Sequence, residues 1–321
     1  MESMNMSYMD PKTVTLIGIP GLEHVQFWIG FSFFAVCLVA LLGNIILLII
    51  IPTEHSLHQP MYIFLAVLAA TDIGLCVAIA PKMLAIFWFG FYSMAFDACL
   101  AQLFFIHALQ GMESGILLAM AFDRYVAISI CNPLHYKVVL THSRIMGMGL
   151  ASMTRGVVLM VPLPILLKRL PFCKDVILSH SYCYHPDVMK LACGPITVNI
   201  IYGFGLGLFV MLSTLGVDAV LILLSYVMIL KAVLSIASNA KRLKALNTCI
   251  SHICVVLLFY TPQVSLSVIH RFGKKKLPAQ VYMLLSYLHF LVPPMLNPIV
   301  YTVKTKEIRV WILKMFQRRK F

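Results

Sequence analysis

Residues 99–125 form an apolar segment with ionisable side chains inside it and read CLAQLFFIHALQGMESGILLAMAFDRY. As an α-helix rising 1.5 Å per residue, this segment would be about 39 Å long, enough to cross the ~30 Å hydrocarbon core of a bilayer. Ionisable groups at membrane depth are costly, so each must face protein or water and is a candidate functional residue. We therefore predict a membrane helix that links a polar middle to the acid–base pair Asp123 and Arg124 at its far end.

The composition of the whole chain argues for several such helices. Of its 321 residues, 61% are hydrophobic and 12% are charged, about half the charged fraction of a typical soluble domain. The formal net charge is +13, but the basic residues fall between apolar segments, without an aromatic-interleaved patch or zinc-finger spacing. This arrangement argues against a nucleic-acid partner. The N-terminus lacks the features of a cleaved signal peptide, so we expect the first span to direct insertion.

Seven apolar segments are each close to the ~20 residues that a membrane helix needs. No repeat relates the two halves of the chain, which argues against transporter folds built from duplicated halves. The predicted fold is an all-α bundle of seven transmembrane helices over residues 27–303, with an N-terminal segment 1–26 and a tail 304–321. The predicted spans are Phe27–Ile51, Met61–Trp88, Cys99–Phe122, Ile145–Leu167, Val198–Val227, Ile250–Ile269 and Val281–Val303.

The positions of Lys and Arg predict an extracellular N-terminus and a cytoplasmic tail, because the inner loops and tail then carry more of these residues than the outer side. The triplet Asn5-Met6-Ser7, a glycosylation acceptor, would then face the lumen. Basic clusters at the inner end, near Arg242 and Arg319, are expected to attract anionic membrane lipids.

Four cysteines fall on the predicted outer side, where disulfides persist: Cys99, Cys173, Cys183 and Cys193. Two bridges among them would fix the long loop after span 4 over the helix ends. His180 and His185 flank Cys183, which raises the alternative of a zinc site. Their spacing matches no established ligand pattern, so we predict no metal centre there.

Short motifs mark the ends of the predicted spans. They are GN at 43–44, LHQPMYIFL at 57–65, MAFDRYVAI at 120–128, SY at 225–226, KALNTCISH at 244–252 and PMLNPIVY at 294–301. Together they resemble the odorant receptors, the olfactory branch of the rhodopsin-like G-protein-coupled receptors. GIPGLE at 18–23 and HRFG at 270–273 resemble the class I, fish-like members.

The resemblance implies a plasma-membrane receptor without enzymatic activity or cofactor, which binds small odorants and activates a stimulatory heterotrimeric G protein to raise cyclic AMP. With it we expect disulfides between Cys99 and Cys183 and between Cys173 and Cys193. One departure is Ser129-Ile130, which separates the DRYVAI motif from the following CNPLHY. Two extra residues would rotate a continuing helix by about 200° or be absorbed as a bulge. This departure bears on G-protein coupling.

The family's activation switch corresponds here to Asp123, Arg124 and Tyr125, where the aspartate restrains the arginine at rest. From the residues alone, Arg124 could instead be an interfacial side chain that extends its charge to the water. The resemblance assigns further activation residues to the inner ends of spans 5 and 7: Tyr226, Asn297, Pro298 and Tyr301.

Asp72 and Glu113 are carboxylates at mid-membrane depth. Left charged and unpaired, each would cost several kcal/mol, so each must be protonated, hydrogen-bonded or neutralised by a cation. Asn44 and Asn297 are expected neighbours. The two alternatives are a sodium or proton site that biases the resting state, and a static polar network.

Arg271 is the predicted ligand anchor, because a guanidinium group can pair a carboxylate through two hydrogen bonds. Class I receptors are associated with carboxylic-acid odorants, and the resemblance places Arg271 at the ligand-facing end of span 6. The alternative is a solvated charge beside Lys274–Lys276. Ser267 lies one helical turn away and could bond the same anion. The other predicted contacts are His107, Gln110, Ile106, Gly111, Phe104, Leu206, Phe209 and Tyr260.

The leading hypothesis is a ligand-gated receptor in which binding shifts a population towards an open inner cleft. The second is a transporter or ion pathway through Asp72, Glu113, Asp218 and His289. An enzyme is disfavoured by the lack of an HExxH motif, nucleophile elbow or phosphate loop. A retinal photoreceptor is disfavoured because span 7 has no lysine before Lys304.

Overall fold

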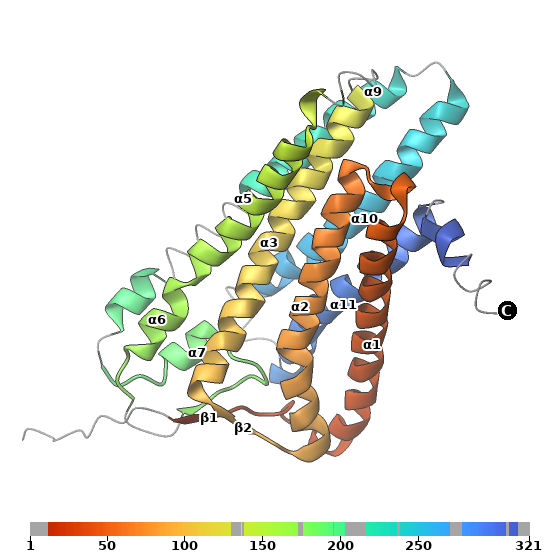
Figure 1. The fold of residues 1–321 in the computed structure, drawn as a ribbon. Helices are drawn as coiled ribbons and strands as arrows, with labels where there is room; N and C mark the ends of the chain where they lie inside the picture. The colour runs from red at the N-terminus through yellow and green to blue at the C-terminus, as the bar shows by residue number, and fades with distance from the viewer. Residues whose placement is uncertain are drawn as a thin grey trace, which may run out of the picture.

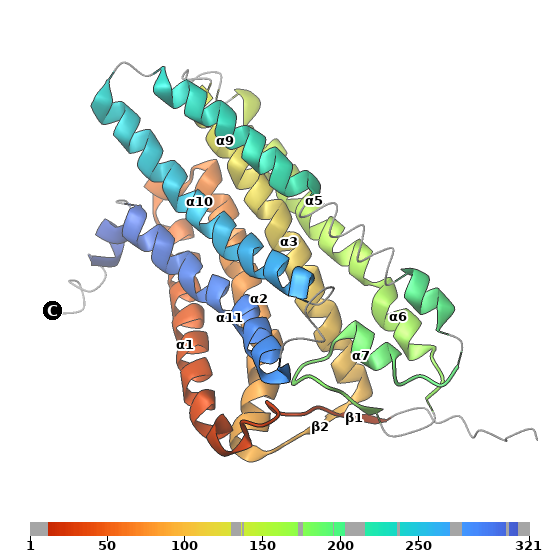
Figure 2. The ribbon, with the colours of Figure 1, turned by 180° about the vertical axis from the view of Figure 1, so that it is seen from behind.

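The computed structural model describes residues 12–129, 136, 138–172, 176–194, 196–202, 216–235, 238–269, 278–305 and 308–313. Within these residues, seven helical spans are long and apolar enough to cross a membrane. They lie together in one elongated bundle (Figures 1 and 2). The helices are α1 (Glu23–Thr53), α2 (Pro60–Phe89), α3 (Phe96–Ser129), α5 (His142–Met160) with its continuation α6 (Pro162–Lys168), α9 (Ala219–Leu234), α10 (Asn239–Val268) and α11 (Ala279–Lys304).

Helix α3 lies at the centre of the bundle and contacts α2, α5, α9 and α10. Its apolar side chains, such as Ile116 and Leu117, are fully buried, whereas α5 and α9 expose large apolar side chains, such as Leu150 and Leu223. An apolar exterior of this kind is stable only in lipid, where every backbone group must be bonded within its own helix. The described residues thus confirm the predicted seven-helix membrane fold.

Several predicted spans differ from the helices in their bounds, among them the fourth and the sixth. The fourth is one candidate span over His142–Lys168, within which Val161 separates α5 from α6 while keeping helical backbone angles. Pro162 follows Val161, and proline lacks the N–H that an uninterrupted helix uses. The sixth begins at Asn239, well before the predicted Ile250. A helix satisfies its own backbone hydrogen bonds in water as well as in lipid. Helix α10 can therefore include the polar residues before its apolar span, Cys249–Leu266.

A three-stranded sheet covers the predicted outer end. Strand β1 (Thr13–Thr15) pairs antiparallel with β2 (Ser93–Ala95) and parallel with β3 (Val176–Ile177). Two apolar side chains of the N-terminal segment, Val14 and Leu16, are buried against the bundle. The N-terminal segment is therefore tied to the loops after α2 and α6.

A disulfide joins Cys99 at the start of α3 to Cys183 in the long loop, as expected. Gln102 fixes the same loop, because its Oε1 accepts a hydrogen bond of 3.0 Å from the Cys183 backbone N–H. With its sulfur in the disulfide, Cys183 is not available for the zinc alternative, and His180 pairs with Asp187 instead. Cys173, the other half of the second predicted disulfide, lies outside the described residues, as does Asn5.

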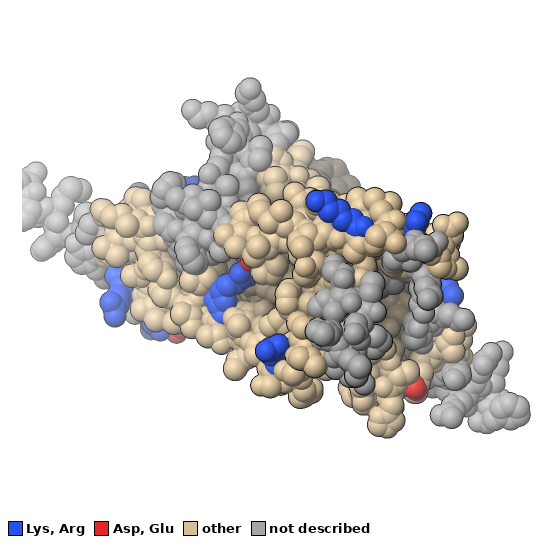
Figure 3. All heavy atoms as spheres, turned by 90° about the horizontal axis from the view of Figure 1, so that it is seen from above, with Lys and Arg blue, Asp and Glu red and all other residues tan. Residues whose placement is uncertain are grey.

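The opposite end of the bundle carries basic side chains. Figure 3 looks onto the end at which α3 finishes, and Lys and Arg are scattered over this face among few acidic groups. A short helix at residues 308–313 follows α11, and its Trp311 donates a hydrogen bond to Glu54, just after α1. The charge distribution agrees with the predicted cytoplasmic side.

Candidate ligand and activation sites

Polar side chains from three elements converge about two to three helical turns below the disulfide. Gln110 Nε2 on α3 donates a hydrogen bond of 2.7 Å to His289 Nε2 on α11. His107, one turn nearer the disulfide, interacts with Gln110 and electrostatically with both His289 and His185. His185 begins α7 (His185–Met189), a short helix in the long loop. We call His107, Gln110, His185 and His289 the outer polar cluster.

Two nitrogens of the outer polar cluster are buried without a hydrogen-bond partner among the described residues: Nε2 of His185 and Nδ1 of His289. Because His289 Nε2 accepts from Gln110, the neutral ring carries its proton on the unpartnered Nδ1. A buried donor without a partner is costly, so the cluster is suited to a ligand that supplies an acceptor.

His185, the member of the outer polar cluster on the long loop, brings little positive charge at neutral pH. Burial, and to a smaller extent the neighbouring His107, lower the pKa of His185 from 6.5 to about 4. His185 is therefore a neutral hydrogen-bonding group in the folded protein. A carboxylate ligand would need its countercharge from elsewhere.

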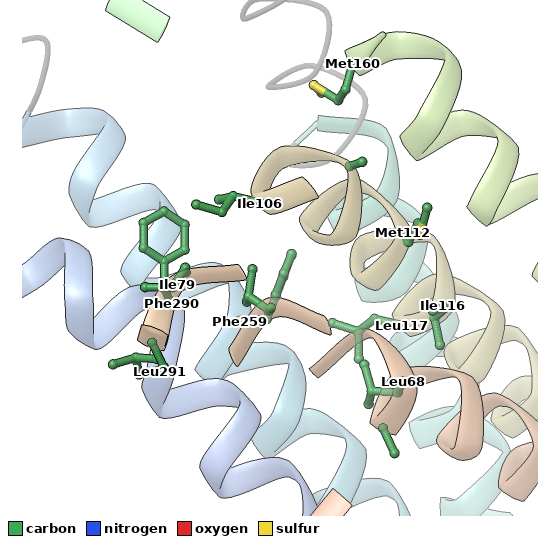
Figure 4. Packing of buried hydrophobic residues seen from close by; sticks show 14 of the residues in the cluster. Leu68, Ile79, Ile106, Met112, Ile116, Leu117, Met160, Phe259, Phe290 and Leu291 are labelled. Atoms are coloured by element: carbon green, nitrogen blue, oxygen red, sulfur yellow. The ribbon is translucent and has the colours of Figure 1, made fainter. Parts of the chain in front are cut away.

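The remaining predicted ligand contacts divide into several groups. Ile106 is buried and lies on the side of α3 towards Phe290 (Figure 4). Phe104 is half-buried, with its ring edge-on to Phe105. Gly111 packs against α5, where a Cβ would lie 3.3 Å from the Gly156 Cα. Arg271, Leu206, Phe209 and the side chain of Ser267 lie outside the described residues.

A buried hydrogen-bonded network joins four helices beneath the outer polar cluster. Ser114 on α3 donates to Asp218 Oδ2 at 2.6 Å, and the Tyr260 hydroxyl on α10 lies 3.0 Å from the Ser114 Oγ. Arg155 on α5 pairs with both Asp218 oxygens at 3.1 and 2.7 Å, and donates to the Gly111 carbonyl at 3.2 Å. We call Ser114, Arg155, Asp218 and Tyr260 the central network.

Sequence reasoning named Tyr260 as a ligand contact and Asp218 as part of a relay, but missed Arg155. The signal was present, because an arginine inside a predicted span is a functional candidate by default. The structure places the Tyr260 hydroxyl on the central network, so its position suits transmission between helices.

Asp72 and Glu113 lie together at the same depth, both almost fully buried. Asn297 on α11 donates to Asp72 at 3.0 and 3.3 Å and also interacts with Glu113. Glu113 Oε1 has no hydrogen-bond partner among the described residues. Asn44, expected beside these carboxylates, instead bonds the Ala40 and Pro294 carbonyls and so links α1 to α11.

At the inner end, Asp123 holds Arg124 through two hydrogen bonds of 2.5 and 3.0 Å. The Tyr136 hydroxyl donates to the other Asp123 oxygen at 2.8 Å. Burial, followed by the charge of Asp123, raises the pKa of Tyr136, so its hydroxyl keeps its proton. This geometry is that of a restrained arginine. Helix α3 includes Ser129, and Ile130 lies outside the described residues.

The other predicted activation residues link the inner halves of α3, α9, α10 and α11. The Tyr226 hydroxyl bonds His252 Nδ1 on α10, and Tyr125 packs on the small cluster of Ile229, Val233 and Cys249. Tyr301 is buried with its hydroxyl 3.9 Å from Met120 Sδ. Pro298 packs on α1, where a Cβ on Gly43 would lie 2.7 Å from its Cγ.

Comparisons with known proteins give one consistent family. Residues 33–319 match a family model described as "Olfactory receptor". Human olfactory receptor 51E1 is 54% identical over 301 residues, covering 94% of this chain and 92% of that protein. Human olfactory receptor 51G2 is also 54% identical, covering 95% of each chain. Squid rhodopsin shares the fold, with a TM-score of 0.67 at 17% identity over 94% of this chain and 87% of that one.

Proposed function

Because the chain belongs to the olfactory receptor family of multi-pass plasma-membrane receptors, we propose that it recognises small carboxylic-acid odorants in a pocket among the outer halves of spans 3, 5 and 6. Binding would raise cyclic AMP through a stimulatory G protein. The observation that carries this proposal is the arrangement along α3. One helix contributes to the outer polar cluster, the central network and the Asp123–Arg124 pair. His107 and Arg124 are 17 residues apart, so about 25 Å separates recognition from response.

We assign the ligand's countercharge to Arg271. The described outer cluster is polar but supplies a neutral His185, so an anion bound beside it requires a cation from another element. In the sequence, Arg271 follows Ile269 by two residues, and a guanidinium's fork of donors suits a carboxylate. The apolar tail of the odorant would then contact residues such as Ile106.

Replacing Arg271 with alanine should weaken the cyclic-AMP response to a series of aliphatic carboxylic acids of graded length by at least about tenfold in half-maximal concentration, because a charge-assisted bond is lost. Arg271→Lys should recover part of the response, and Lys274→Ala, which removes a nearby cation, should leave it unchanged. An unaltered acid response in Arg271→Ala, at matched surface expression, would remove the ligand assignment.

Asp72 and Glu113 are proposed to bind a sodium ion that stabilises the resting state. The unpartnered Glu113 Oε1 beside a second buried carboxylate supports a cation over a self-contained network. A proton relay for transport is not favoured, because Asp72 and Asp218 are bonded to different partners, Asn297 and Arg155.

Sodium should therefore lower ligand-free cyclic-AMP output in membranes, compared with the bulky cation N-methylglucamine at equal ionic strength. In Glu113→Gln this sodium effect should disappear, because the amide is neutral and a weaker ligand for a hard cation. Glu113→Gln keeps the size of the side chain, so the fold is retained. A sodium response that persists in this variant would favour the static network.

A further inference from the structure

A groove runs along the lipid-facing side of α5. Its inner part, about 460 Å³, is bordered by Phe122 on α3 and Arg144 at the start of α5. Its deeper part, about 570 Å³, continues to Thr154 and Arg155. Gly147 and Ala151 line both parts, so the two hollows are continuous along one face of α5. The residues that line the deeper part all belong to α5, whereas Phe122 of α3 borders the inner part.

The length of the groove matches one leaflet of a bilayer. Arg144 lies in the first turn of α5, which the Thr141 side chain caps at the inner end. From Arg144 to Arg155 the helix rises about 16 Å, and half of a ~30 Å hydrocarbon core is about 15 Å. The groove thus extends from the inner membrane surface to the depth of the central network.

Contact with a neighbouring helix does not require a glycine at position 147. A Cβ at Gly111, Gly115 or Gly156 would meet the neighbouring helix within about 3.3 Å, whereas one at Gly147 would meet nothing within 4 Å. The space above Gly147 is therefore open, apolar and of a width set by its neighbours on α5 and α3. Such a space in a membrane suits an acyl chain.

The inner mouth of the groove carries a fixed positive charge. Arg144 Nη1 donates to the backbone carbonyls of Val138 and Val139 at 3.3 and 2.9 Å, which holds the guanidinium at the mouth. The side chain is exposed, and its other donors have no partner among the described residues. Anionic lipids concentrate in the cytoplasmic leaflet and are attracted by such cations.

From these observations we propose that the groove binds an anionic phospholipid of the inner leaflet, with its phosphate on Arg144 and one acyl chain over Gly147 and Ala151. The tip of the chain reaches Arg155, whose side chain is 26% exposed. An occupied groove covers this side chain and shields its ion pair with Asp218 from competing polar groups. Bound lipid therefore stabilises the central network, independently of which odorant the receptor recognises.

The test uses the full chain in nanodiscs of phosphatidylcholine alone or with phosphatidylserine added. Phosphatidylserine should raise the midpoint of thermal unfolding, and native mass spectrometry should detect one retained anionic lipid. Gly147→Leu, which fills the groove, should abolish both effects. Arg144→Gln should weaken lipid retention about fivefold, the worth of one interfacial cation. Gly149→Leu is the matched control, because a Cβ there also meets nothing within 4 Å but Gly149 does not line the groove.

Several results would overturn the proposal. Equal stabilisation of wild type and Gly147→Leu would mean that the lipid acts elsewhere. Loss of the effect in Arg144→Gln alone would indicate a head-group contact without a groove. Stabilisation by cholesterol but not by phosphatidylserine would assign the groove to a sterol, and a change of oligomeric state in Gly147→Leu would assign it to a second copy of the chain.

Discussion

Replacing Arg155 with methionine should destabilise the receptor by about 3–5 kcal/mol and remove most of it from the cell surface. Asp218 is 2% exposed, and the variant leaves its carboxylate with Ser114 as its remaining described hydrogen-bond partner. A loss of this size is a large part of the 5–15 kcal/mol that holds a typical domain folded. Surface labelling in cells and thermal unfolding of the purified protein measure the effect.

Two controls test whether the loss in Arg155→Met comes from leaving a buried charge without its partner. Lys168 and Asp97 form an ion pair of the same 2.7 Å length, but both side chains are more than half exposed. Lys168→Met should therefore change surface expression little. The double variant Arg155→Met with Asp218→Asn should recover most of the expression, because it leaves no buried charge without its partner. Equal damage in the single and double variants would contradict a charge-based explanation.

Gly156→Ala should separate α5 from α3 and destabilise the bundle by about 1–3 kcal/mol. The added Cβ would lie 2.5 Å from the Ala108 carbonyl oxygen and 2.8 Å from Met112 Cγ. The carbonyl belongs to the backbone of α3, so it cannot rotate away as a side chain can. The same shift would displace Arg155, the next residue on α5, from Asp218. The expected results are a lower midpoint of thermal unfolding and a weaker maximal response at matched expression.

Gly149→Ala provides the comparison, because it adds the same methyl group seven residues earlier on α5 where nothing lies within 4 Å. This variant should unfold at the wild-type midpoint or slightly above it, since alanine favours a helix over glycine. If both variants were equally destabilised, helix propensity or lipid contact would be the cause rather than the approach of α3.

The apolar runs were sufficient to predict the seven spans, because lipid requires long self-bonded helices. The apolar runs could not predict which faces of the helices contact each other. Arg155 and Asp218 are 63 residues apart, and Asn297 and Asp72 are 225 apart. Each pairing depends on how two helices rotate and tilt against each other, which hydropathy does not encode. The boundary between α5 and α6 at Val161 could have been predicted from Pro162, because proline lacks the N–H that an uninterrupted helix uses.

The candidate site was predictable in part. His107 and Gln110 were expected to lie on one helix face from their spacing, and Asp123 beside Arg124 followed from the family motif. His185 and His289 were not expected beside them, because a disulfide and the packing of α11 bring them there. Gly111 was assigned to the ligand, yet small residues serve equally for close helix contacts, and the structure shows such a contact. Arg271 stays a prediction.

The strand pairing of β1 also sets an order of events during synthesis. Val14 pairs with Val176, so the N-terminal strand cannot complete its sheet until the loop after α6 has been made. At roughly 5–20 residues per second, the ribosome needs on the order of 10–30 s to add the intervening chain. The other partner of β1, the strand β2, directly follows α2 and is available earlier, so the sheet can form in two steps. The sheet over the outer end is therefore completed only after the first four of the seven spans have been synthesised.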